Sequence, residues 1–164
     1  MSLLPKLTLS IAPIENTPIA KRALDLSWIL PNLAVGAFPS RENLASLKDL
    51  KITHILNLCL TPDFPEIQDS FNYCHNPTND LYDSQEPSWF FCSLDFGLKA
   101  LQKPSQKLYI HCFAGISRSP ATAYVLLRAL GKTKKDSEYL LSQARPHAKK
   151  AYRLSAEEAL ESYL

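Results

Sequence analysis

Residues Tyr109–Pro120 read YIHCFAGISRSP and join two segments of different character. Before the loop, residues 107–111 make a short alternating, β-rich run that is typical of a buried strand. After it, Pro120 and the helix-forming stretch 121–130 predict a helix with proline in its first turn. We therefore expect a strand–loop–helix unit. Its loop holds a cysteine, a glycine and an arginine, which are Cys112, Gly115 and Arg118.

The residue types in this loop suit a phosphate group held against a nucleophilic sulfur. A loop that ends at a helix N-terminus points several backbone N–H groups at one place, and the helix dipole adds positive charge there. Gly115 lets the backbone turn tightly, and Arg118 offers a planar fork that can bind two phosphate oxygens. The same positive field stabilises a thiolate at Cys112, which is the nucleophilic form of cysteine. The residues expected to bind the phosphate are Phe113, Ala114, Gly115, Ile116, Ser117 and Arg118.

Residues 111–119, HCFAGISRS, resemble the His-Cys-x-x-Gly-x-x-Arg-Ser signature of the cysteine-dependent dual-specificity phosphatases. The AGISRS part is most similar to the branch that acts on MAP kinases and to its small atypical relatives. The resemblance implies an α/β fold in which a central, mostly parallel sheet is flanked by helices, as in the protein tyrosine phosphatases. It also implies hydrolysis of phosphotyrosine and of phosphoserine or phosphothreonine in proteins through a phosphocysteine, with no metal or other cofactor. The competing interpretation is a buried cysteine followed by chance by an arginine.

The resemblance also assigns roles to single residues. Cys112 is the expected nucleophile, Arg118 binds the phosphate, and Ser119 donates a hydrogen bond to the departing sulfur. Asp80 precedes Cys112 by a spacing similar to that of the family's general acid, and a placed acid contributes about 10²–10⁴ in rate. Asp83, in the same polar loop, is the alternative acid. The competing interpretations are a solvated loop carboxylate for Asp80 and an ordinary cap residue for Ser119.

The rest of the chain reads as one catalytic domain preceded by a short segment. Residues 1–24 are interrupted by prolines and form either an edge strand or an N-terminal arm, while the domain is expected over 25–164. Apolar periodicity predicts the elements of this domain. They are strands at 28–30 and 33–35, a helix after Ser40, a strand at 52–60, a loop at 62–70, a strand at 71–75, and helices at 87–103, at 133–145 and from Ser155 onward.

One departure from the family pattern concerns the support of the loop. Family members often place an asparagine between an Arg-Pro pair and the last helix, where it braces the phosphate-binding loop. Here Arg145-Pro146 is present, but no asparagine follows Asn79, so the bracing must come from elsewhere. The region instead holds three basic residues, which form either a solvated face or a rim that attracts acidic phosphopeptides. These are Lys149, Lys150 and Arg153.

Two other functions remain open on the same fold. The first is a phosphoinositide phosphatase, but such relatives usually carry lysines inside the loop, where this chain has Phe113, Ile116 and Ser117. These residues favour protein substrates. The second is a phosphate-binding module without activity, which the missing asparagine permits. The intact cysteine and arginine, together with the candidate acid, argue against it.

A second cysteine raises the question of redox control. The sequence Asn57-Leu58-Cys59 is similar to a site in phosphoinositide 3-phosphatases where another cysteine captures the oxidised nucleophile. Cys59 is therefore a possible redox partner of Cys112. The alternative is a cysteine that simply packs in the core, since free cysteine is among the most buried residue types. Cys74 and Cys92 are also available as partners.

Composition sets the remaining expectations. The chain has 164 residues, which suits a single domain, and we expect a monomer. A net charge of +2 is too small to suggest nucleic acid or an acidic membrane as a partner. No apolar run is long enough for a membrane span, and no signal peptide or lipidation motif is seen. The 4 cysteines form no C-x-x-C pair and suit a reducing compartment, so a cytoplasmic enzyme is expected.

Overall fold

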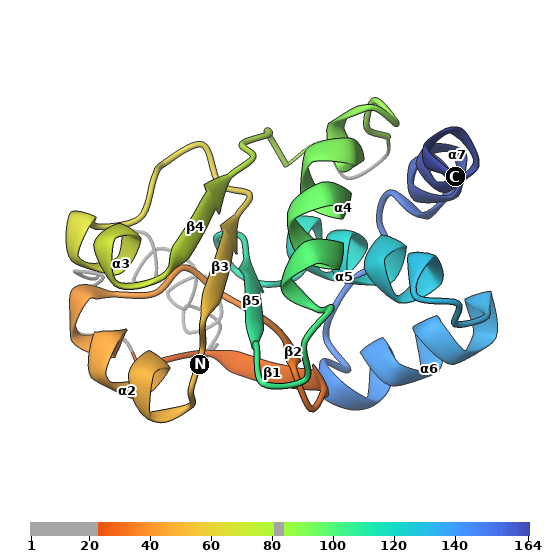
Figure 1. Ribbon diagram of the computed structural model, residues 1–164. Coiled ribbons are helices and arrows are strands. Elements are labelled where there is room, and N and C mark those ends of the chain that lie inside the picture. Colours follow the sequence, from red (N-terminus) through yellow and green to blue (C-terminus); the bar gives the residue numbers. More distant parts are fainter. Residues whose placement is uncertain (1–22, 81–83) are drawn as a thin grey trace, which may run out of the picture.

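The computed structural model describes residues 23–80 and 84–164, so most of the expected N-terminal segment 1–24, and Asp83, lie outside the described residues (Figure 1). Strands and helices alternate in the middle of the chain, from β3 to α5, while a hairpin of two strands comes first and three helices come last. In order they are β1 (Leu26–Leu30), β2 (Leu33–Gly36), the 3₁₀ helix η2 (Arg41–Asn43), α2 (Leu44–Asp49), β3 (His54–Asn57), α3 (Pro65–Ser70), β4 (Asn72–His75), α4 (Trp89–Ala100), β5 (Leu108–His111), α5 (Arg118–Ala129), α6 (Lys134–Ala144) and α7 (Arg153–Tyr163).

The strands form one sheet in the order β1-β2-β5-β3-β4. Only the β1–β2 hairpin is antiparallel, and the other three pairings are parallel. β5 lies in the centre, where Gly36 of β2 and Asn57 of β3 both stand opposite His111. The carboxyl ends of three parallel strands therefore meet where the Cys112 loop begins. The predicted α/β fold with a mostly parallel sheet is confirmed.

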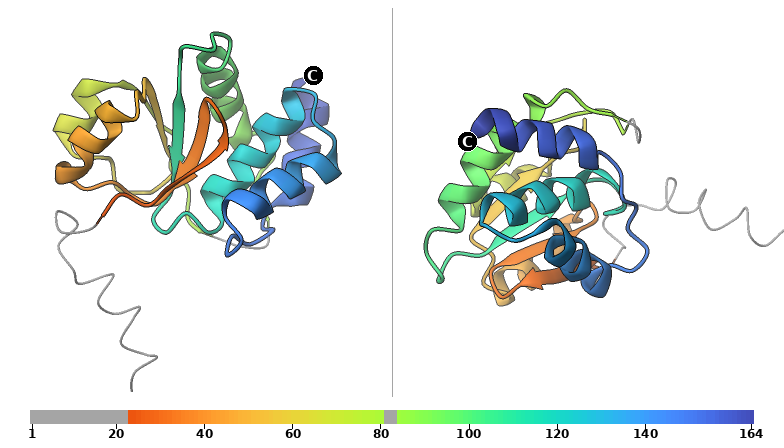
Figure 2. Two further views of the ribbon diagram at one scale, coloured as in Figure 1. Left: turned by 90° about the horizontal axis from the view of Figure 1, so that it is seen from below. Right: turned by 90° about the vertical axis from the view of Figure 1, so that its right-hand side faces the viewer.

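Helices cover both faces of the sheet, as Figure 2 shows, with α2 and α3 on one face and α4 to α7 on the other. The side chains of the strands alternate between these faces. On β5, Tyr109 packs in the smaller cluster with residues of α2 and α3, whereas Leu108 and Ile110 belong to the larger cluster with α4, α5 and α7. α5 is the central helix of the second face and is buried from Arg118 to Leu127. Within the described residues, no helix is long and apolar enough to cross a bilayer.

Two expectations about local structure are wrong. Residues 62–70 were expected to be a loop, but Pro65–Ser70 form α3, with Pro65 in the first turn and Ile67 buried. A helix of fewer than two turns is too short to show helical periodicity in the sequence. The prolines therefore indicated only an interruption of regular structure. The last helix begins at Arg153 rather than at Ser155. The hydroxyl of Ser155 accepts a hydrogen bond from the backbone N–H of Gln85 at 3.1 Å instead of capping the helix.

Candidate active site

The loop between β5 and α5 is held with its carbonyl groups turned outward. Four consecutive carbonyls accept hydrogen bonds from outside the loop, with donor–acceptor distances of 2.8–3.3 Å. Because the C=O and N–H of one peptide unit point in opposite directions, the N–H groups that follow point to the concave side. The loop is thus shaped to receive an anion. The accepting carbonyls belong to Phe113, Ala114, Gly115 and Ile116.

Gly115 is required for this shape. Its φ of +68° lies in the left-handed region, which glycine adopts without steric cost. A Cβ atom at this position would also lie 2.5 Å from Nη2 of Arg145 and 2.7 Å from the carbonyl carbon of Gly36. Both the backbone conformation and the lack of space therefore exclude larger residues here.

Arg145 supplies the brace that the missing asparagine leaves open. Its side chain is fully buried, and it donates from Nε to the Gly115 carbonyl at 2.8 Å and from Nη2 to the Ala114 carbonyl at 3.3 Å. Its fork also binds the Asp25 carboxylate, at 2.9 and 3.1 Å. A planar guanidinium can bridge two backbone carbonyls and a carboxylate at once. The sequence indicated Arg145 only as the end of a helix, and Asp25 was not singled out.

The sulfur of Cys112 lies at the bottom of the loop beside Ser119. Cys112 Sγ is 3.2 Å from Ser119 Oγ, and both residues are buried. The Ser119 hydroxyl also donates to the Gly36 carbonyl at 3.3 Å, so its single proton has two possible acceptors. A charged sulfur is the stronger acceptor of the two. The hydroxyl of Ser119 is thus within hydrogen-bond reach of the sulfur, and its role in turnover stays a prediction.

Arg118 opens α5, and its guanidinium reaches across to the opposite wall. Its Nη1 donates to the carbonyl of Thr78 at 2.9 Å and to that of Leu58 at 3.5 Å. Its Nε is buried and has no hydrogen-bond partner among the described residues. A buried donor without a partner is costly unless a ligand satisfies it. Arg118 therefore ties the segment before Asp80 to the loop and keeps a donor available.

Asp80 faces the same cavity as Cys112. This phosphate cradle, as we call it, is a cavity of about 250 Å³. The carboxylate of Asp80 accepts a hydrogen bond from the hydroxyl of Tyr152 at 3.0 Å, an interaction that no motif in the sequence predicts. The cradle is lined by Asp80, Cys112, Phe113, Ala114, Ile116, Ser117, Arg118 and Lys149.

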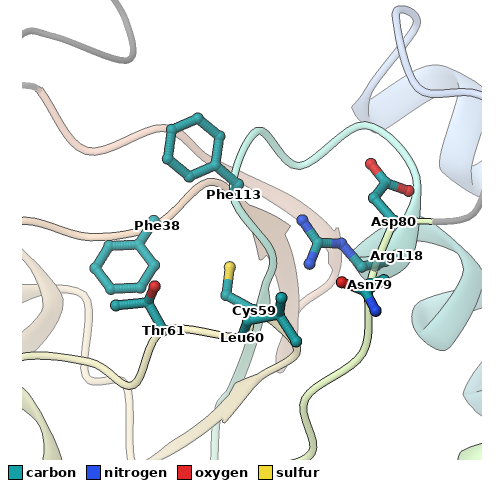
Figure 3. Close-up of a pocket in the computed structure, with 8 residues that line it drawn as sticks. All are labelled: Phe38, Cys59, Leu60, Thr61, Asn79, Asp80, Phe113 and Arg118. Carbon is teal, nitrogen blue, oxygen red and sulfur yellow. The ribbon is translucent and has the colours of Figure 1, made fainter.

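A second cavity, of about 300 Å³, adjoins the cradle and shares Asp80, Phe113 and Arg118 with it. Figure 3 shows the rings of Phe38 and Phe113 on one side of this cavity and Asp80 with Arg118 on the other. The two cavities together join an apolar space to the anion-binding loop. The remaining lining residues are Cys59, Leu60, Thr61 and Asn79.

The family model for the dual specificity phosphatase catalytic domain matches residues 33–156. This chain belongs to the dual specificity phosphatase family. The human dual specificity protein phosphatase 9 (Homo sapiens) is 36% identical to it over 103 residues. That alignment covers 62% of this chain and 27% of the relative, so the chain spans about a quarter of the length of that curated protein.

Solved structures share the architecture of this phosphatase domain. The crystal structure of DUSP15 matches with a TM-score of 0.69 at 25% identity, over 86% of this chain and 88% of the other. The crystal structure of PTPMT1 in complex with PI(5)P has a TM-score of 0.69 at 18% identity, over 84% of this chain and 93% of the other. At that identity the second likeness concerns the fold alone.

The phosphatase domain places Cys59 at the edge of the site. Cys59 is buried, and its sulfur lines the second cavity together with Arg118. Burial, and then the neighbouring Cys112, raise the pKa of the Cys59 thiol to about 12, so it is protonated at neutral pH. Cys74 and Cys92 lie with their sulfurs 3.7 Å from each other. All four are free thiols. The pairing of Cys59 with Cys112 stays a prediction.

Of the three basic residues predicted to form either a solvated face or a basic rim, only Lys149 lines the phosphate cradle. Its backbone N–H donates to the Ile116 carbonyl at 2.8 Å, which fixes this segment against the loop. Arg153 instead pairs with Glu138 at 2.6 Å and stacks on Tyr124, and the choice between a solvated face and a basic rim stays a prediction. The side chain of Lys150 lines another hollow, beside Glu138.

Proposed function

We propose that this domain hydrolyses phosphate monoesters through a phosphocysteine at Cys112, acting on phosphotyrosine and on phosphoserine or phosphothreonine in proteins. One observation carries the proposal: a single cavity joins a cysteine, a guanidinium and a carboxylate over a loop whose carbonyl groups are all bonded on its outer side. Membership of the dual specificity phosphatase family supports the same conclusion. The loop and Arg118 bind the phosphate, and Cys112 attacks it.

In the first step the Cys112 thiolate forms a bond to phosphorus while the ester P–O bond breaks. The loop N–H groups and the free Nε of Arg118 hold the non-bridging oxygens, whose charge spreads in the transition state. Asp80, in its protonated form, gives its proton to the leaving oxygen. Tyr152 donates to Oδ1 of Asp80, which leaves Oδ2 for the proton.

In the second step water attacks phosphorus and the S–P bond breaks. Asp80, now a carboxylate, takes a proton from the attacking water, and inorganic phosphate is released. The Ser119 hydroxyl turns from the Gly36 carbonyl to the sulfur and stabilises the departing thiolate. Asp80 thus acts as the acid in the first step and as the base in the second, and Ser119 donates its hydrogen bond to the sulfur in the second step.

The lining of the site supports protein substrates. The apolar second cavity beside the phosphate cradle suits the side chain of a phosphorylated residue and its neighbour. Lys149 at the cradle is the one observation that favours the alternative, a phosphoinositide with a second phosphate. A binding module without activity is disfavoured, because Asp80 lines the cradle and Ser119 Oγ lies 3.2 Å from the sulfur, and the roles proposed for both belong to turnover.

The compartment, the oligomeric state and the partners of the protein are part of the same proposal. We place it in the cytoplasm because the nucleophile must remain a free thiol, as all four cysteines are here. We propose a monomer because the phosphate cradle is built by residues of one chain. Nucleic acid is not proposed as a partner, since the net charge is only +2.

The test compares four substrates at equal concentration: an aryl phosphate, a phosphotyrosine peptide, a phosphothreonine peptide and a phosphoinositide. Hydrolysis of the aryl phosphate and of both peptides is expected. Cys112→Ser should abolish turnover and keep tungstate binding, because the loop donors remain. Full activity of Cys112→Ser would refute the mechanism, and exclusive hydrolysis of the phosphoinositide would refute the substrate class.

A further inference from the structure

Two cysteines from different elements bring their sulfurs together beside the edge strand of the sheet. Cys74 lies in β4, the last strand in the sheet order, and Cys92 lies in the first turn of α4. Their Sγ atoms are 3.7 Å apart, and both are free thiols. A disulfide has about 2.0 Å between its sulfurs, so an approach of about 1.7 Å would form the bond. Rotation of the two side chains can supply a movement of that size.

Hydrogen bonds around the pair hold the two elements together. Asn76 follows Cys74 by two residues. Its Nδ2 donates to the Trp89 carbonyl and to the Ser93 hydroxyl, both at 2.9 Å. Trp89 and Ser93 lie before and after Cys92 in the first turns of α4. The end of β4 is therefore fastened to the part of α4 that carries Cys92, and the two sulfurs stay within reach of each other.

The two thiols differ in exposure, and this difference gives them different parts in an oxidation. Cys92 is exposed, whereas Cys74 is half-buried and packs against the larger core cluster. An oxidant from solvent therefore meets Cys92 first. Burial, and then the neighbouring Cys92, raise the pKa of the Cys74 thiol above its usual value, which slows its own attack on an oxidant. Cys74 is thus placed to react with an oxidised Cys92 rather than with the oxidant.

We propose that Cys74 and Cys92 form a reversible disulfide when the protein meets hydrogen peroxide, with Cys92 oxidised first. In the first step the Cys92 sulfur bonds to one peroxide oxygen and the O–O bond breaks, which gives a sulfenic acid and one water. In the second step the Cys74 sulfur attacks the Cys92 sulfur and the S–O bond breaks. The hydroxide that leaves takes the Cys74 proton and becomes the second water. Two thiols thus give two electrons to one peroxide, and a dithiol reductant reverses the bond.

The pair is separate from the phosphate cradle. Neither Cys74 nor Cys92 is among the described residues that line the cradle or the cavity beside it. The inference does not rest on the proposed function, because oxidation of these thiols needs no turnover. It also removes Cys74 and Cys92 from the candidate redox partners of Cys112, which leaves Cys59.

The bond closes a loop of the chain that contains Asp80. Within this loop Thr78 is already held, because its carbonyl accepts from Arg118 at 2.9 Å and its hydroxyl accepts from the Gln85 side chain. A cross-link between residues 18 positions apart restricts the unfolded chain more than the folded one. We therefore expect oxidation to raise Tm by about 6–12 °C for a chain of this size, and reduction to reverse the rise.

The test treats the full chain with increasing hydrogen peroxide, blocks the remaining thiols with iodoacetamide and maps cross-linked peptides by mass spectrometry. A link between positions 74 and 92 is expected in wild type and in Cys112→Ser, and it should disappear on reduction. In Cys74→Ser the sulfenic acid has no thiol to trap it, so oxidation of Cys92 to the sulfinic acid should increase several-fold. Cys59→Ser is the matched control and should still form the link.

Tm is measured on oxidised Cys112→Ser, where the nucleophile cannot react. Cys92→Ser in the same background should lose both the link and the rise in Tm, and it should fold because Cys92 is exposed. Absence of the link at every peroxide concentration would overturn the proposal. A link from either cysteine to Cys112, or to a second copy of the chain on a non-reducing gel, would also overturn it. A link with an unchanged Tm would refute the stabilisation.

Discussion

Replacing Arg145 with methionine removes the brace beneath the phosphate-binding loop while keeping much of the apolar volume. Its side chain has no exposed surface, and it holds the carbonyls of Gly115 and Ala114. Leaving a buried polar group unpaired costs about 1–3 kcal/mol, so two carbonyls predict a loss of about 3 kcal/mol in the free energy of unfolding. For a chain of this size that lowers Tm by roughly 6–12 °C.

The partner Asp25 gives an internal comparison. Its side chain is 51% exposed, so the ion pair with Arg145 is largely open to solvent on that side. Such pairs contribute up to about 1 kcal/mol, and Asp25→Asn should therefore lower Tm by only about 2–4 °C. If Arg145 stabilises the domain mainly through the loop carbonyls, Arg145→Met must lower Tm clearly more than Asp25→Asn does.

The assay combines thermal unfolding with tungstate binding and kcat/KM for an aryl phosphate. Arg145→Met should weaken tungstate binding as well as stability, because the loop N–H groups lose their fixed direction. Arg128→Met is the control, since Arg128 lies near the C-terminal end of α5, far along the helix from the loop, and pairs with Glu157 of α7 at 2.7 Å. Equal losses in Arg145→Met and Asp25→Asn, or unchanged tungstate binding in Arg145→Met, would refute the brace.

Three further predictions concern single side chains. Asp80→Asn should slow substrates with poor leaving groups far more than those with good ones and remove the alkaline limb of the pH profile; the same pattern in Asp83→Asn instead would reassign the acid. After peroxide and then thiol reductant, wild type should recover more activity than Cys59→Ser, and the trapping should speed up as pH rises towards the Cys59 pKa of about 12; equal recovery makes Cys59 a core residue only. Lys149→Met should weaken kcat/KM for acidic phosphopeptides and its salt dependence, whereas Lys150→Met should not; identical behaviour excludes the basic rim.

The loop between β5 and α5 could be predicted from the sequence because the residues that determine its shape are close together in the chain. Cys112, Gly115 and Arg118 lie within seven consecutive residues, and a strand before them and a helix after them fix their geometry. The same holds for the hairpin of β1 and β2 and for α6, whose predicted start at position 133 is the residue that caps it: Thr133 accepts from the Asp136 N–H. Asp80 could be placed only by the resemblance, since nothing in its own surroundings marks it as an acid.

The supports of the loop could not be predicted, because each joins residues far apart in the chain. Arg145 meets Asp25 across 120 positions, and His111 meets Asp63 across 48. Asp63 stands in a stretch that the sequence predicts to be a polar loop, yet its side chain is buried in the folded chain. No periodicity or motif predicts such a pair, because the residue type alone does not show whether a carboxylate is buried or exposed.

Gly36 shows how the distant supports constrain one another. A Cβ atom there would lie 1.9 Å from the carbonyl oxygen of Asp25 and 2.7 Å from the hydroxyl of Tyr109. Its own carbonyl accepts from the Cys112 N–H at 3.4 Å and from the Ser119 hydroxyl at 3.3 Å. The end of β2 thus touches the brace on one side and the nucleophile on the other. Any side chain at position 36 would separate them, which is why a glycine that looks like an ordinary strand end is part of the site.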